Sequence, residues 1–216
     1  NYAVDYVVDR YPFLKAVLFF FPKGNKELGL TQLRDCADNG KYSRTEATVT
    51  LAYIHLSYEK NYLEALKYAQ KLTAIYPGNP VFERFLGKCY VGLNNYNAGI
   101  PLYGGMQAKA DSNKPGYNNN YIRREVNYYL GVCYSRTGNL DEALKKYETA
   151  IEICKITDKP GEESPYYVFS ILGTGVIYEQ KGNKPEAIKY YDMVLGMRDV
   201  ENSKETAQKF KDNALE

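Results

Sequence analysis

Apolar and small residues recur at helical spacing through most of the chain, and short polar turns separate the periodic segments. The clearest segment is 128–153, YYLGVCYSRTGNLDEALKKYETAIEI. Its turn is Gly138-Asn139. Glycine there can adopt the left-handed conformation that ends one helix, and asparagine can cap the next. The pattern therefore predicts two antiparallel helices that cross closely at small residues and carry aromatic side chains beside the crossing. These small and aromatic positions are Leu130, Gly131, Tyr134, Ala143, Tyr147 and Ala150.

The same spacing occurs in three further segments, so chance does not account for it. With the first example they cover 43–77, 79–109, 118–155 and 164–197. The earliest copy has one extra residue in its turn and places His55 where the others have tyrosine. In the other three copies the small residue of the first helix and the tyrosine that follows it are Gly87 and Tyr90, Gly131 and Tyr134, and Gly175 and Tyr178.

This pattern resembles the tetratricopeptide repeat, a helix-turn-helix unit of about 34 residues. The resemblance implies an all-α fold, a right-handed α-solenoid of about five antiparallel helix pairs. We expect one continuous solenoid over 1–216, with a degenerate repeat at 11–38 and a C-terminal capping helix at 200–215 that covers the last apolar face.

Two linkers make the repeats longer than usual. Gly87, Gly131 and Gly175 are each 44 residues apart. The excess falls in two segments that contain Lys-Pro-Gly, at 114–116 and 159–161. Proline and glycine break helices, so we predict loops around 110–119 and 157–164.

The most apolar stretch is FLKAVLFFFPKGN, residues 13–25. It is too short to span a bilayer, which needs about 20 apolar residues as a helix. Its Gly24-Asn25 pair repeats the spacing of the later turns, so we interpret it as the first helix of the degenerate repeat. Consecutive helical positions point about 100° apart. At least one of Phe19, Phe20 and Phe21 is therefore expected to face away from its partner helix.

Composition limits which classes of partner and which cellular compartment are expected. The formal net charge is +2, from 28 basic and 26 acidic residues, which does not favour nucleic acid or an anionic membrane as the main ligand. The four cysteines are scattered, and we expect free thiols in a reducing, cytoplasmic compartment. The chain begins at Asn1, so a removed signal peptide would instead indicate a periplasmic or exported protein. The stretch GLTQLRDCADNGKYSRTEA resembles bacterial repeat proteins, some of them exported.

No set of residues forms a recognisable catalytic, cofactor or metal site. The single histidine, His55, lies at a core position of its repeat, as do Cys89 and Cys133, and no motif supplies a base beside either thiol. One histidine and no C-x-x-C pair argue against zinc. The glycine turns are helix ends and match neither phosphate-binding motif. We therefore expect no enzyme activity, no cofactor and no metal.

The resemblance also implies where a partner binds. In this family the first helices of successive repeats line a concave groove that receives an extended peptide or a partner's helix. The chain would then be a scaffold for protein–protein interaction. The groove candidates are Tyr53, Arg84, Lys88, Glu125, Tyr128, Ser135, Arg136 and Gln180, together with the apolar Val132, Phe169, Leu172 and Val176.

Two alternatives to this groove hypothesis remain. The charged clamp that some family members use for terminal carboxylates is not present as a set, because positions equivalent to Lys88 hold Tyr53, Val132 and Val176. The first alternative is that Arg84, Lys88 and Arg136 are simply solvated side chains and that Tyr128 packs on a neighbour. The chain could also be a structural or self-associating module of a larger exported or envelope-associated assembly.

Overall fold

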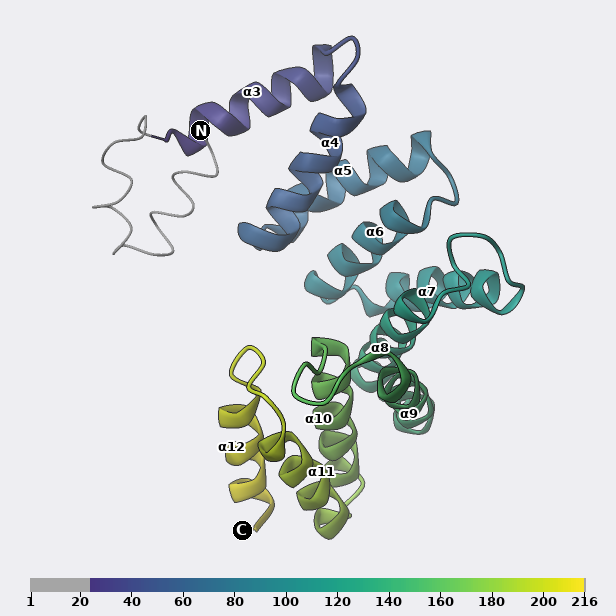
Figure 1. Cartoon of the computed structure of the whole chain (residues 1–216), viewed down its shortest axis with the longest axis vertical. Coiled ribbons are helices and arrows are strands. Elements are labelled where there is room, and N and C mark those ends of the chain that lie inside the picture. The colour runs from purple at the N-terminus through teal and green to yellow at the C-terminus, as the bar shows by residue number, and fades with distance from the viewer. Residues whose placement is uncertain (1–23, 216) are drawn as a thin grey trace. The chain divides into compact units, whose positions relative to one another are not determined.

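The computed structural model describes residues 24–215, in which all regular secondary structure is helical and no strand occurs. The predicted all-α fold class is confirmed. Consecutive helices are joined by short turns and loops (Figure 1). The helices are α3 Lys26–Asn39, α4 Arg44–Tyr53, the π-helical turn η2 Ile54–Tyr58, α5 Tyr62–Ile75, α6 Pro80–Gly92, α7 Tyr96–Asp111, α8 Asn120–Arg136, α9 Leu140–Thr157, α10 Pro165–Gln180, α11 Lys184–Gly196 and α12 Ser203–Leu215.

The described part of the chain forms two compact units, which divide between Cys89 and Tyr90. In the first unit α3 packs on α4, and α4 packs on α5. In the second, α8 packs on α7 and α9, and α10 packs on α9 and α11. The single continuous solenoid stays a prediction. The first helix of the degenerate repeat at 11–38, with Phe19, Phe20 and Phe21, lies outside the described residues.

The turns of the repeats share one backbone hydrogen bond. The amides of Asn139 and Asn183 donate to the carbonyls of Tyr134 and Tyr178, both at 2.9 Å. Gly138 and Gly182, which precede these asparagines, have φ of +82° and +75°. This is the left-handed conformation expected of a glycine that ends a helix.

The earliest copy of the turn absorbs its extra residue differently from the prediction. The Asn61 amide donates to the His55 carbonyl at 2.9 Å, so the same bond spans one residue more. The extra residue is accommodated by the π-helical turn η2, in which the Glu59 amide donates to the Ile54 carbonyl at 3.0 Å. A π turn bonds each amide to the carbonyl five residues earlier, so it holds one residue more than an α-helical turn while keeping a backbone hydrogen bond. The insertion therefore lies in the helix and not only in the turn.

The asparagine caps follow the prediction with one exception. Asn61 and Asn183 accept the amides of Glu64 and Glu186 at 3.2 and 3.3 Å. Asn139 occupies the same position before α9, but its side chain makes no capping hydrogen bond. Its backbone carbonyl still accepts the Ala143 amide at 3.0 Å. The prediction that Asn139 caps the helix through its side chain is wrong.

The core of the second unit depends on small residues that face tyrosine rings. A Cβ atom added to Gly131 would lie 2.5 Å from Cδ1 of Tyr147, and one added to Gly175 would lie 2.7 Å from Cε1 of Tyr191. Tyr147 and Tyr191 are 4 % and 0 % exposed. The glycines thus make room for the rings themselves.

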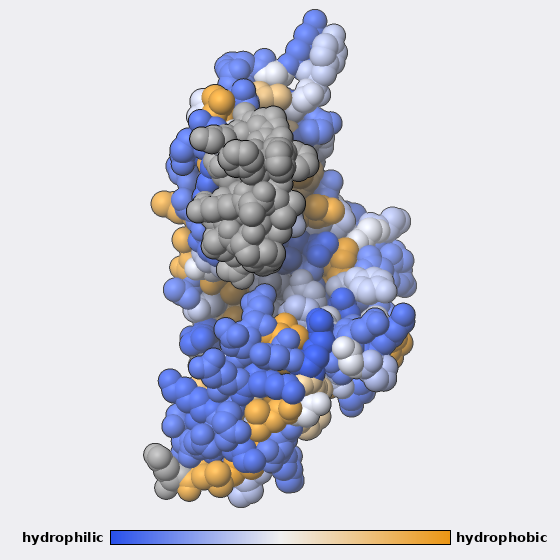
Figure 2. Space-filling model, turned by 60° about the vertical axis from the view of Figure 1, so that its left-hand side comes forward, coloured by the Kyte–Doolittle hydropathy of each residue, from blue (hydrophilic) through white to orange (hydrophobic). Residues whose placement is uncertain are grey.

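The face shown in Figure 2 is mostly hydrophilic where residues are described, with apolar residues in separate spots.

The loop between α9 and α10, predicted at 157–164, is held by one buried carboxylate. Asp158 forms an ion pair with Arg124 of α8, with side chains 6 % and 13 % exposed. It also accepts the Ser164 amide at 2.8 Å. The Arg124 guanidinium lies over the rings of Tyr121 and Tyr166, at 5.0 and 5.6 Å from their centroids. The loop is therefore an ordered part of the second unit.

The last helix, α12, covers the end of the helix series. It packs on α11 and α10. Ala207 and Ala214 are buried against them, and Phe210 lies 5.8 Å from the Tyr191 ring. Its outer positions are exposed and polar, as a capping helix requires. These exposed residues are Glu205, Gln208, Lys209, Asp212 and Asn213.

His55 is buried without a hydrogen bond to either ring nitrogen among the described residues. It is 4 % exposed and stacks on Tyr68, with ring centroids 5.9 Å apart. Its pKa is lowered, mainly because burial disfavours the charged ring, although Glu64 and Glu59 oppose this effect and Arg34 and Lys26 add to it. The position is a packing site, as the sequence predicted.

This burial predicts acid sensitivity. The unfolded chain takes up the His55 proton near pH 6.5, whereas the folded chain does so only at lower pH, so stability falls as the pH drops below about 6.5. We expect the wild-type melting temperature to decrease by several degrees between pH 7.5 and 5.5, and His55→Phe to lose measurably less. Circular dichroism melts at both pH values test this. An equal loss in the two proteins would contradict it.

Candidate functional site

A hollow in the second unit has a volume of about 520 Å³. Residues from α8, α9, α10 and α12 line it, and most of them are apolar or aromatic. This size and mixture are typical of binding sites for small ligands or for a few side chains of a partner. The lining residues are Tyr128, Val132, Ser135, Arg136, Tyr147, Phe169, Leu172, Gly173, Val176, Gln180 and Phe210. We call this set the groove.

Helix α8 supplies one wall. Its N-terminus is capped by Asn119, whose side chain accepts the Ile122 amide at 2.9 Å. Tyr128, Val132 and Arg136 follow at intervals of four residues, so they lie on one face of the helix. The opposite face holds Leu130 and Cys133, both at most 1 % exposed. The sequence thus separates a core face from a groove face on the same helix.

Helix α10 supplies the second wall in the same register. It begins at Pro165 after the cap Ser164, whose hydroxyl accepts the Tyr167 amide at 3.3 Å. Leu172, Val176 and Gln180 are each 44 residues beyond Tyr128, Val132 and Arg136. Equivalent turns of the two helices therefore line equivalent levels of the groove. This register assigns the six residues to three levels along the groove, with Tyr128 and Leu172 at one, Val132 and Val176 at the next, and Arg136 and Gln180 at the third.

Glycine and tyrosine form the floor of the groove between these walls. A Cβ atom on Gly173 would lie 2.7 Å from Cζ of Tyr147. Glycine at this position therefore leaves room for the Tyr147 ring. Burial raises the pKa of Tyr147, and it raises the pKa of Tyr128 to about 12, with a smaller contribution from Glu201. Both phenols therefore stay neutral at physiological pH and can donate a hydrogen bond to a ligand.

The structure brings together four of the eight groove candidates. Tyr128, Ser135, Arg136 and Gln180 all line the groove. The apolar candidates Val132, Phe169, Leu172 and Val176 line it with them.

Glu125 has a different environment from the one expected of a groove residue. It lies on α8 but is only 1 % exposed, and it does not line the groove. Its negative charge acts instead on the buried Tyr103 phenol of α7, whose pKa is raised first by burial, then by Tyr129 and by Glu125. Three residues before Tyr128 on a helix, Glu125 is rotated toward α7, which packs on α8.

The other three candidates belong to the first unit. Tyr53 of α4 is 45 % exposed and lies 5.5 Å from the ring of Tyr58. Arg84 and Lys88 are half-buried on α6. Their part in a groove shared with the second unit stays a prediction.

Three groove residues were not among the candidates from the sequence. Tyr147 occupies a core position of its repeat, and its role in the groove floor depends on the absent side chain at Gly173. Phe210 belongs to the capping helix, and its place in the groove depends on how α12 packs. A glycine at position 173, in addition to the repeat glycine Gly175, was the one signal in the sequence that could have indicated the opening.

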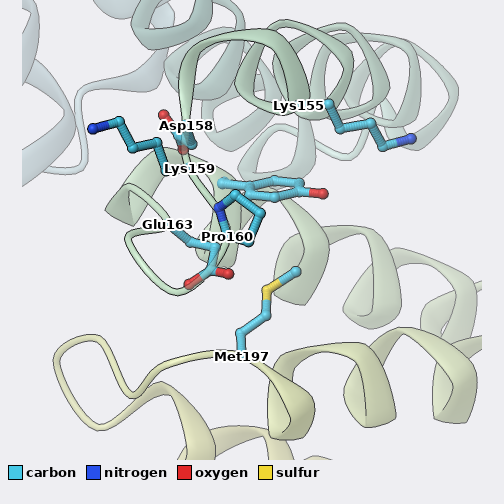
Figure 3. Close-up of a pocket in the computed structure, with 7 residues that line it drawn as sticks. Lys155, Asp158, Lys159, Pro160, Glu163 and Met197 are labelled. Atoms are coloured by element: carbon cyan, nitrogen blue, oxygen red, sulfur yellow. The ribbon is translucent and has the colours of Figure 1, made fainter.

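A smaller hollow of about 290 Å³ lies beside the loop between α9 and α10. It is lined by residues on both sides of the loop and by Met197. The ammonium groups of Lys155 and Lys159 point in opposite directions, away from Pro160 and Met197 (Figure 3). Lys155 is already paired with Glu152 at 2.7 Å. The charged groups do not converge on one point, so this hollow is not a candidate catalytic centre.

No group of three or more His, Cys, Asp or Glu residues within 24–215 could hold a metal ion. The four cysteines are free thiols. Burial raises the pKa of Cys133 to about 11, which keeps this thiol protonated and unreactive. None of the helices described here is long and apolar enough to cross a membrane.

Comparisons with known proteins agree with this architecture. A family model described as tetratricopeptide repeat matches residues 123–199. A search of curated protein sequences found no match. Among solved structures, MamA (residues 41 to the end) from Desulfovibrio magneticus RS-1 is similar with 16% identity and a TM-score of 0.61, covering 88% of this chain and 93% of its own.

Two further solved structures have the same fold. YrrB, described as a TPR protein with an unusual peptide-binding site, is 20% identical with a TM-score of 0.58, covering 96% of this chain and 92% of its own. A putative kinesin light chain from Podosopora anserina, with nearly identical TPR-like repeats, is 18% identical with a TM-score of 0.58, covering 80% and 85%. Residues 123–199 therefore match the tetratricopeptide repeat model, and the described residues share the helical-repeat fold of these solved structures.

Proposed function

We propose that this protein is a non-enzymatic scaffold that binds a segment of a partner protein in the groove of its second unit. The observation that supports this most directly is the row of apolar side chains that remain half-exposed on the groove faces of α8 and α10. Val132, Phe169 and Val176 are partly exposed and line a hollow of about 520 Å³. Covering them with apolar side chains of a partner would contribute about 25 cal/mol for each Å² removed from water.

The groove also has polar groups that could orient a bound segment. Ser135, Arg136 and Gln180 provide hydrogen-bond donors at one end, and the phenols of Tyr128 and Tyr147 lie in its floor. A few polar groups around an apolar hollow give orientation and specificity to a site whose affinity comes from burial. The similarity to YrrB is consistent with peptide binding but is a likeness of fold. Self-association and an exported location stay predictions.

Selection from a random peptide library against the purified chain tests the proposal. We expect selected peptides to lose at least about tenfold in affinity for Val176→Lys, because the ammonium group would enter the apolar hollow. Met193→Lys is the matched control, since Met193 is 44 % exposed on α11 and does not line the groove. We expect that control to stay within about twofold of wild type.

Titration calorimetry gives the affinities, and circular dichroism verifies that both variants are folded. Equal binding by wild type and Val176→Lys would show that the selected peptides use another surface, and the groove proposal would then fail.

A further inference from the structure

The polar side chains of the groove gather at one end. Ser135 and Arg136 belong to the last turn of α8, and Gln180 is the last residue of α10. Since α8 and α10 each run antiparallel to α9, they run in the same direction, and their C-termini lie at the same end of the groove. The other levels are apolar or aromatic. The polarity of the groove therefore changes along its length. Hydrogen-bond donors lie at one end, and the rest is a hollow that could hold bulky apolar side chains.

Arg136 carries the only formal charge among the lining residues. Its guanidinium makes no hydrogen bond or ion pair with the described part of the chain. Glu179, which precedes Gln180, accepts the Tyr191 hydroxyl at 2.5 Å, and Asp141 pairs with Lys181. The charge of Arg136 reaches the floor of the groove, where it partly offsets the raised pKa of Tyr147.

Arg136 is also not needed to satisfy the end of its own helix. The carbonyls of Cys133 and Ser135 accept the amides of Thr137 and Gly138 at 3.0 and 3.2 Å. The helix dipole places about half a negative charge at this terminus, but these bonds occupy the carbonyls that carry it. The full positive charge of the exposed guanidinium therefore dominates contact with a ligand at this end.

We propose that the groove binds an extended partner segment that places a side-chain carboxylate on Arg136 and bulky apolar side chains over the next two levels. This rests on the proposed function and specifies its ligand. The carboxylate would accept hydrogen bonds from Arg136, with Ser135 and Gln180 as further donors. The apolar side chains would contact Val132 with Val176, and then Tyr128 with Leu172.

The helix geometry sets the spacing of these ligand residues. Adjacent levels are four residues apart on α8 and α10, which is a rise of about 6 Å. Two residues of an extended chain cover about 6.6 Å. The matching segment therefore reads acid, any residue, apolar, any residue, apolar. We commit to the extended form, in which alternate side chains of the ligand face the groove.

Fluorescence anisotropy with synthetic peptides tests this. The probe is fluorescein-Gly-Asp-Gly-Leu-Gly-Phe-Gly-amide, whose blocked ends exclude recognition of a terminal carboxylate. A second probe has lysine in place of aspartate. We expect wild type to bind the aspartate probe at least about tenfold more tightly than the lysine probe, with a preference that weakens as salt is added. Arg136→Glu is expected to reverse the preference.

Lys184→Glu is the control for the change of charge, since Lys184 is exposed on α11 and does not line the groove. It is expected to keep the wild-type preference. The proposal is overturned if neither probe binds, if Arg136→Glu keeps the preference for aspartate, or if a stapled helical peptide with its acid and apolar residues at intervals of four binds more tightly. If library peptides remain sensitive to Val176→Lys in any of these cases, the groove still binds a partner and only its ligand class is wrong.

Discussion

Gly131→Ala is expected to lower the free energy of unfolding by about 2 kcal/mol, because the added methyl group has no room. The new Cβ atom would lie 2.5, 2.6 and 3.0 Å from Cδ1, Cε1 and Cγ of Tyr147. That ring is buried among Ala143 and Ile177, both 0 % exposed, so it cannot move away without displacing its neighbours. The cost of this overlap exceeds the gain of up to about 1 kcal/mol that alanine brings to a helix interior.

Gly105→Ala is the matched control in the same unit. Gly105 lies inside α7, and a Cβ atom there would meet nothing within 4 Å. Only the helix-propensity effect remains, so this change is expected to stabilise by about 0.5–1 kcal/mol. Urea denaturation followed by circular dichroism measures both variants. If the two alanines shift stability in the same direction, the close approach of α8 to Tyr147 does not determine the effect.

Asp158→Ala is expected to destabilise the second unit by about 3 kcal/mol, since it leaves the Arg124 guanidinium buried without its partner. The two side chains are 34 residues apart in sequence and form a mostly buried ion pair. Asp158 also accepts the Ser164 amide at 2.8 Å, directly before α10 begins. Losing the carboxylate therefore removes both the ion pair and the anchor of the loop. Urea denaturation and hydrogen exchange at the Ser164 amide measure the two consequences.

The same carboxylate contributes to acid sensitivity. Burial alone would raise the pKa of Asp158, but the hydrogen bonds from Ser164 and the charge of Arg124 outweigh burial and lower it. Its stabilisation is complete above the unfolded pKa of about 3.9 and is lost as the pH falls through the lower folded pKa. Glu152→Gln is the control for Asp158→Ala. The ion pair between Glu152 and Lys155 is largely exposed, so its loss is expected to leave the melting temperature unchanged within error. A similar loss in both variants would contradict a special role for the buried pair.

The sequence pattern was sufficient for the helix pairs because their turns are encoded locally. Gly138 and Gly182 have positive φ, and the asparagines after them begin the next helices. The small residues Gly131 and Gly175 also indicated where two helices approach closely. Each of these features depends on one residue and its immediate neighbours, so a single sequence contains enough information to place them.

The groove could be predicted only in part, and the reason is geometric. Periodicity shows that Val132 and Arg136 share a face of α8, but it does not show what that face meets. Glu125 is polar and was expected on the surface, whereas packing of α7 on α8 buries it. Phe210 was expected only in the cap, and it enters the groove because α12 packs on α10 and α11.

The sequence by itself determined the kind of fold, the order of the helices and the turns between them, because hydrophobic period, small residues and helix caps act over a few neighbouring residues. Only the tertiary structure decided that Arg124 and Asp158 form a buried pair, that a π turn at Ile54–Tyr58 absorbs an inserted residue, and that Tyr147 and Phe210 complete the groove. The ion pair and the groove depend on contacts between segments far apart in the chain, and no local pattern records which of the permitted contacts is made. The π turn is local, but the inserted residue alone did not show whether the helix or the turn takes it up.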